Sequence, residues 1–236
     1  MIDPLAAEST MASLTDPAAV TQKGVLFDLD GTLVDTAPDL VAALNLALND
    51  AGFASVMLDE VRHAASHGSM ALVRAAKPSI PDQQAYLLQQ SLLSHYAEVN
   101  GRHCQLFEGI APLLDALGRA HIPYGIVTNK AACFARPLIE RIGLASSCKA
   151  LISGDSVTRG KPDAAPMLLA ASQLNRAARH IVYLGDAKRD MEAARAAHMT
   201  AALASWGYIS AGDDIHSWPV DVTLAHPLSL LAQLGL

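Results

Sequence analysis

Two carboxylates, Asp28 and Asp30, directly follow an apolar run, and a glycine and a hydroxyl, Gly31 and Thr32, come next. Residues 25–27 are typical of a strand buried on both faces, as in a parallel sheet covered by helices. Because unpaired carboxylates are costly to bury, we expect both acids where this strand leaves the sheet, at the edge where open α/β sheets bind ligands. Two acids there favour a divalent cation, and the turn after them offers backbone N–H groups to an anion.

The elements that must position these residues repeat the design of the first strand. Apolar runs of strand length recur at residues 125–127, 150–152, 181–184, 200–205 and 220–224, and helical patterns interleave with them at 112–120, 131–142, 164–174 and 189–197. This alternation predicts an α/β fold built on a doubly wound parallel sheet. Right-handed crossovers would bring the polar ends of the strands to one edge of that sheet.

Residues 37–105 interrupt the alternation, because only helical patterns occur there, at 38–51, 58–67, 69–76 and 82–99. We therefore expect a small all-helical cap domain inserted after the first strand, over the carboxyl edge of the sheet. The catalytic core would then consist of residues 23–36 and 106–236. Residues 1–22 lack the basic start and apolar centre of a signal peptide, and we expect them to form a flexible extension.

The composition narrows the classes of partner. Hydrophobic residues make up 51% of the 236 residues and charged residues 17%, which is enough apolar material for a folded core. A net charge of −6 without basic clusters argues against nucleic acid as a partner, and no apolar run reaches the roughly 18 residues that a membrane span needs. Three cysteines without metal-ligand spacing fit a reducing compartment. We expect a cytoplasmic monomer or small homo-oligomer.

Further polar residues follow the later strands in a definite order. Thr128 comes after the run at 125–127, Lys161 precedes a helix, and Asp186 and Asp190 stand four residues apart after the run at 181–184. Together with Asp28-x-Asp30, this order resembles the motif set of the haloacid dehalogenase superfamily, a large group of aspartate-nucleophile phosphatases. The resemblance implies a Rossmann-like core and a small phosphorylated metabolite as the substrate.

The resemblance also implies roles for the acidic residues. Asp28 would be the nucleophile that forms an aspartyl-phosphate. Asp28, the backbone carbonyl of Asp30 and the carboxylate of Asp186 would hold Mg²⁺. Asp30 would protonate the leaving oxygen and then deprotonate the attacking water. Asp190 would orient metal-bound water or Lys161 without binding the metal directly.

The remaining roles concern the phosphate and the cap. Gly31, Thr32, the hydroxyl of Thr128 and the N–H of Asn129 would bind phosphate oxygens, and Lys161 would balance their charge. In the cap, His67 and Ser69 would contact the substrate. Two other lysines, Lys130 and Lys188, are expected to be exposed.

Within the superfamily, the helical insert after the first motif resembles the phosphoglycolate phosphatase group. Residues 66–70, 106–109, 127–130 and 206–209 are similar to the N-acetylmuramic acid 6-phosphate phosphatases. Either 2-phosphoglycolate or N-acetylmuramic acid 6-phosphate is therefore an expected substrate. A sugar phosphomutase of the same superfamily and a non-catalytic phosphate-binding regulator stay open as alternatives. Asp30 speaks against a dehalogenase, because a leaving halide needs no proton.

Overall fold

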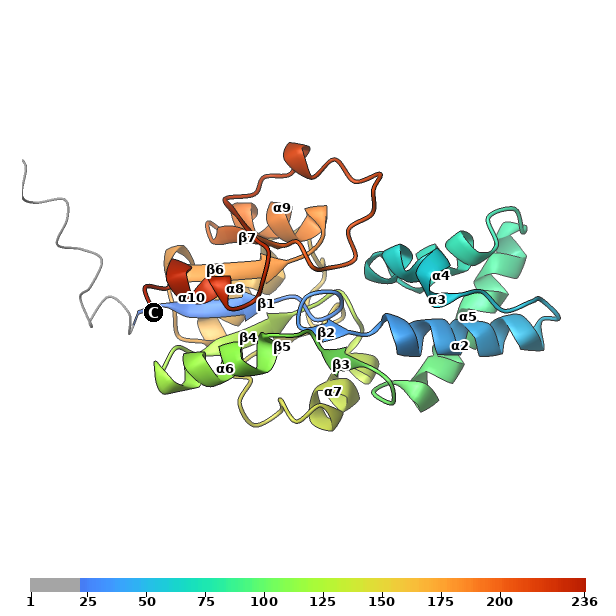
Figure 1. The fold of residues 1–236 in the computed structure, drawn as a ribbon, viewed down its shortest axis with the longest axis horizontal. Helices are drawn as coiled ribbons and strands as arrows, with labels where there is room; N and C mark the ends of the chain where they lie inside the picture. The colour runs from blue at the N-terminus through green and yellow to red at the C-terminus, as the bar shows by residue number, and fades with distance from the viewer. Residues whose placement is uncertain (1–21) are drawn as a thin grey trace, which may run out of the picture.

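The computed structural model describes residues 22–236, and a six-stranded parallel sheet forms its centre. The strands lie in the order β5-β4-β1-β6-β7-β8 (Figure 1). Their bounds are β1 Gly24–Phe27, β4 Tyr124–Val127, β5 Leu151–Ile152, β6 Ile181–Gly185, β7 Thr200–Ala204 and β8 Val222–Leu224. The predicted doubly wound α/β fold is confirmed. The predicted extension at residues 1–22 lies outside the described residues, except for its last position.

Helices cover both faces of the sheet, and alternate residues of β1 face different layers. Val25 and Phe27 pack in a cluster with side chains of α6 (Ile110–Arg119), α7 (Ala132–Arg141) and α10 (Ser229–Gln233). Leu26 packs on the opposite face, with side chains of α8 (Ala165–Gln173) and α9 (Lys188–Ala196). All three strand residues are fully buried, which explains why the run contains no polar position.

A second group of helices lies beyond the end of β1 (Figure 1). These helices have an apolar cluster of their own. The group consists of α2 Ala37–Asp50, α3 Leu58–Val61, the 3₁₀ helix Arg62–His67, α4 Ser69–Ala76 and α5 Asp82–Val99. The single helix predicted over 58–67 is therefore wrong, because its second half winds as a 3₁₀ helix and stops at Gly68, whose φ is +90°. We call this group the cap; its exact domain boundaries stay a prediction.

Two short strands connect the cap to the sheet. β2 (Val34–Asp35) leads into the cap, β3 (Gln105–Leu106) leads out of it, and the two pair antiparallel. Beside them, the buried carboxylate of Asp39 accepts backbone N–H groups from four successive residues, 101–104, at 2.8 to 3.3 Å. The connection is therefore a hydrogen-bonded double strand. Within residues 22–236, no helix has both the length and the apolar character needed to cross a membrane.

His198 supplies a test of backbone strain at the end of α9. It is exposed and has a φ of +58°, in the left-handed region that favours glycine after a helix. We expect His198→Gly to stabilise the protein by about 1 kcal/mol and to raise the melting temperature by roughly 2–4 °C. Thermal unfolding followed by circular dichroism measures the change.

Asn175 is the matched control, because its φ is +53° and asparagine tolerates this region better than histidine. Asn175→Gly should therefore gain less than His198→Gly. A melting temperature of His198→Gly at or below that of the wild type would contradict the account.

Candidate active site

The candidate site lies where three neighbouring strands end. Asp28 follows β1, Thr128 follows β4 and Asp186 follows β6. In the parallel register Phe27 pairs with Ile126 on one side and with Leu184 on the other. Since β1 is the central strand of the three, the polar residues after these strands meet at one edge of the sheet. All three are buried.

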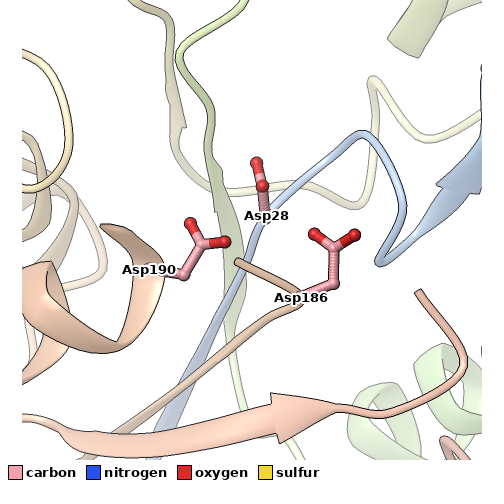
Figure 2. Close-up of side chains that lie close together, drawn as sticks. All are labelled: Asp28, Asp186 and Asp190. Atoms are coloured by element: carbon pink, nitrogen blue, oxygen red, sulfur yellow. The ribbon is translucent and has the colours of Figure 1, made fainter. Parts of the chain in front are cut away.

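Three carboxylates gather at this edge. One oxygen from each of Asp28, Asp186 and Asp190 lies within 4.8 Å of the others (Figure 2). The Nζ of Lys161 lies 2.8 Å from Asp28 Oδ1 and 2.7 Å from Asp190 Oδ1, so that one buried ammonium bridges two of the acids. Tyr183 accepts a hydrogen bond from the same Nζ at 2.8 Å.

The charges of these groups depend on one another. Burial raises the pKa of Asp28 to about 6, although the ammonium of Lys161 opposes the shift. Burial disfavours the charge of Asp190 as well, but Lys161 and then Arg189 hold its pKa below the ordinary value. The pKa of Lys161 is raised, because Asp190 and Asp28 together outweigh the cost of burial. Lys161 therefore stays an ammonium between two carboxylates.

Asp186 has no cationic partner among the ion pairs of residues 22–236. Its Oδ2 accepts the N–H of Tyr208 at 2.8 Å and the hydroxyl of Ser66 at 2.9 Å. Burial, with the negative charges of Asp28 and Asp190, raises its pKa to about 7. A buried carboxylate without a cation, next to two more oxygen ligands, fits a hard divalent ion such as Mg²⁺. Asp28 and Asp186 are the side chains that would hold it.

Close packing around Asp186 requires a glycine at position 31. Gly31 has a φ of +80°, and a Cβ on it would lie 2.2 Å from Asp186 Oδ2. Its N–H donates to the carbonyl of Val34 at 3.0 Å within the turn. That Gly31 and Thr32 bind phosphate stays a prediction. The hydroxyl of Thr32 lies 3.4 Å from Asp186 Oδ1.

Lys130 lies in the site rather than at the surface, which corrects the prediction that it is exposed. Its side chain is 9% exposed, and its Nζ lies 2.7 Å from Asp30 Oδ1. The ion pair compensates the burial and raises the pKa of Lys130 above its ordinary value. A lysine in a loop looks solvated in a sequence, because its partner lies 100 residues away. Lys188, 56% exposed, is confirmed as a surface residue.

Asn129 has a positioning role that the sequence did not indicate. Its side-chain amide donates to the carbonyl of Lys161 at 2.9 Å, and its Oδ1 accepts the N–H of Lys161 at 2.9 Å. This reciprocal pair fixes the backbone of Lys161 beside the acids. Thr128 is buried next to it, and its hydroxyl oxygen accepts the N–H of Lys130 at 3.1 Å.

A cavity of about 490 Å³ connects these residues to the cap. Asp28, Asp30, Thr128, Asn129, Lys130 and Arg189 line it from the core, and Ser66 to Ser69 with Tyr96 line it from the cap. Both predicted cap residues, His67 and Ser69, are therefore placed at the cavity. A cavity of about 550 Å³ beside α6 contains none of the predicted site residues.

Arg189 and Ser66 link the cap to the core, and sequence reasoning missed both. The guanidinium of Arg189 donates to the carbonyl of Ser66 and lies 3.4 Å from His67 Nδ1. Burial, followed by the charge of Arg189, lowers the pKa of His67, which favours a neutral ring beside the arginine. The signal available in the sequence was the place of Arg189, between Asp186 and Asp190.

Comparison with known proteins decides the family. The model of the family described as haloacid dehalogenase-like hydrolase matches residues 25–204. The chain belongs to this family. A phosphoglycolate phosphatase of Xanthomonas campestris pv. campestris is 38% identical over 88% of this chain and 94% of its own length. An N-acetylmuramic acid 6-phosphate phosphatase of Pseudomonas aeruginosa is 39% identical over 89% of this chain and 93% of its own length.

Solved structures agree on the fold. The crystal structure of a predicted phosphoglycolate phosphatase from Haemophilus somnus superposes with a TM-score of 0.79 at 23% identity, and covers 90% of this chain and 98% of that one. A hydrolase from Pseudomonas syringae gives a TM-score of 0.69 at 26% identity, over 90% and 97% of the two chains. The fold of this chain is therefore shared with both solved structures.

Gly31 and Gly52 test the close approach to Asp186. Both have positive φ, +80° and +77°, but a Cβ on Gly52 would meet open space. Alanine at either position should cost about 1 kcal/mol through backbone strain. Only Gly31→Ala should also displace Asp186, and so abolish the rise in melting temperature that Mg²⁺ gives. Thermal melts with Mg²⁺ and with a chelator measure both effects. An equal response of the two variants to Mg²⁺ would disprove the steric role.

The pKa of Asp186 predicts how stability depends on pH. Because its folded pKa, about 7, lies above the ordinary value of 3.8, the unfolded chain releases this proton first. The metal-free protein should therefore lose stability as the pH rises from about 4 to 7, and the stabilisation by Mg²⁺ should grow over the same range. Melting temperatures of the wild type and Asp186→Asn measure both trends. A gain with Mg²⁺ that is independent of pH, or that persists in Asp186→Asn, would contradict the assignment.

Proposed function

We propose that this hydrolase is a Mg²⁺-dependent phosphatase that cleaves the phosphate monoester of a small metabolite through an aspartyl-phosphate on Asp28. The position of Asp28 carries the proposal. It lines the cavity, Lys161 and the N–H of Leu29 hold its Oδ1 at 2.8 and 2.7 Å, and a carboxylate without a cation, Asp186, lies beside it.

In the proposed reaction a carboxylate oxygen of Asp28 attacks phosphorus as the bond to the leaving oxygen breaks. Asp30 gives its proton to that oxygen, and in the second half it takes a proton from the water that attacks phosphorus and releases phosphate. Lys161 balances the charge of the phosphoryl oxygens. A bound magnesium ion would offset the repulsion between carboxylate and phosphate. We assign Thr128 and the N–H of Asn129 to phosphate oxygens.

The part of the cavity between Arg189 and the cap supports a substrate with a second anionic group. Arg189 forms no ion pair within 4.0 Å among the described residues, although it lines the cavity with His67 and Ser69. The relatives named above are a phosphoglycolate phosphatase and an N-acetylmuramic acid 6-phosphate phosphatase. Both esters carry a carboxylate in addition to the phosphate, and we propose them as the leading substrates. The proposal includes a cytoplasmic location, which the three free cysteines support.

Asp28→Asn tests the nucleophile. The amide cannot attack phosphorus, so phosphate release from p-nitrophenyl phosphate with Mg²⁺ should fall roughly a thousandfold or more. The exposed Asp59 offers the same change outside the site, and Asp59→Asn should keep wild-type activity. Circular dichroism would show that both variants are folded. Full activity of Asp28→Asn would reject the assignment.

A substrate panel separates the candidate functions. We expect the highest kcat/KM on 2-phosphoglycolate or N-acetylmuramic acid 6-phosphate, with hexose phosphates lower, because Arg189 would pair with the carboxylate. Arg189→Met should lower the ratio of kcat/KM for these two esters to kcat/KM for hexose phosphates. Interconversion of hexose phosphates without phosphate release would indicate a phosphomutase instead, and no release from any ester would indicate a regulator.

A further inference from the structure

Lys130 and Thr36 hold the same oxygen of Asp30. The Nζ of Lys130 lies 2.7 Å from Asp30 Oδ1, and the hydroxyl of Thr36 donates to that atom at 2.5 Å. No hydrogen bond among residues 22–236 reaches Oδ2. Two donors on one oxygen fix the plane of the carboxyl group and leave the other oxygen free for proton transfer.

The cap supplies the surroundings of this ion pair. Tyr96 belongs to α5, and its ring lies under Lys130 with the Nζ 4.8 Å from the ring centroid. The ring also packs against Phe134 of the core, with the centroids 5.3 Å apart. Tyr96 is 1% exposed and Asp30 is 13% exposed in its side chain, so little water competes for the contact between Lys130 and Asp30.

The hydroxyl of Tyr96 and its ring differ in their contacts. Its Oη is buried and has no hydrogen-bond partner within the described part of the chain. The ring face, by contrast, contacts the Lys130 ammonium, an attraction that is stronger where water is excluded. The contribution of Tyr96 to the site therefore rests on its ring, and the two parts of the side chain can be tested separately.

We propose that Lys130 is the positioning residue of the general acid Asp30, and that the ring of Tyr96 completes this arrangement from the cap. The proposal rests on the proposed function, in which Asp30 supplies a proton. The proton on Oδ2 passes to the leaving oxygen as the phosphorus–oxygen bond breaks. The resulting carboxylate keeps its hydrogen bonds from Lys130 and Thr36 on Oδ1.

Esters with different leaving groups test this role. The value of kcat/KM reports the step in which the leaving group departs, and only a strongly basic alkoxide needs a proton there. Lys130→Met should lower kcat/KM for an alkyl phosphate such as 2-phosphoglycolate roughly ten- to a hundredfold, and that for p-nitrophenyl phosphate less than about threefold. Lys130→Arg, which keeps the charge, should recover part of the loss. The retained aryl phosphatase activity shows that the variant is folded.

Matched variants complete the experiment. The exposed Lys188 provides the same substitution at the surface, and Lys188→Met should leave both kcat/KM values unchanged. Tyr96→Leu, which removes the ring, should reproduce the selective loss in weaker form, and Tyr96→Phe should lose less than Tyr96→Leu. An equal loss on both esters in Lys130→Met, or no loss on either, would overturn the proposal. A wild-type protein that is inactive on both esters would overturn the proposed function, and this proposal with it.

Discussion

The buried charges at the end of the sheet constrain the whole site. Three carboxylates, Asp28, Asp186 and Asp190, lie close together in a region with little water, and the one ammonium beside them, that of Lys161, pairs with Asp28 and Asp190. Burial makes the excess negative charge costly. The pKa of Asp28 is therefore raised to about 6 and that of Asp186 to about 7. A divalent cation would remove the same cost, which supports the proposed Mg²⁺ site.

The strand order of the sheet brings these charges together. Because β1 lies between β4 and β6, the residues that follow these three strands lie close together at one edge of the sheet. Gly31 lets the first loop pass close to Asp186, and Asn129 ties the backbone of Lys161 in place. Ser66 reaches Asp186 from the cap at 2.9 Å, so the cap contacts the same carboxylate that lacks a cation. The contact between the cap and the core thus lies at the carboxylate of Asp186, within the group of buried charges.

The strands and the strand-end acids could be predicted from the sequence, because each depends on local pattern. An apolar run such as 25–27 is typical of a buried strand, and a carboxylate after it is expected where that strand leaves the sheet. Lys161 and Asp190 could be placed through their order along the chain. Lys130 could not, because its burial depends on Asp30 and on the ring of Tyr96, which come from separate elements. The contacts of Arg189 with Ser66 likewise exist only once the cap lies on the core.

The central claim is that the Asp28 carboxylate, held by Lys161, forms a covalent bond to phosphorus. Rapid acid quenching of the enzyme during turnover of a ³²P-labelled phosphate ester tests it most directly. The account predicts radioactive protein whose label maps to the peptide containing Asp28 and is released by hydroxylamine, as expected for an acyl phosphate. Phosphate release with no labelled protein at any time, or a label on another residue, would contradict it.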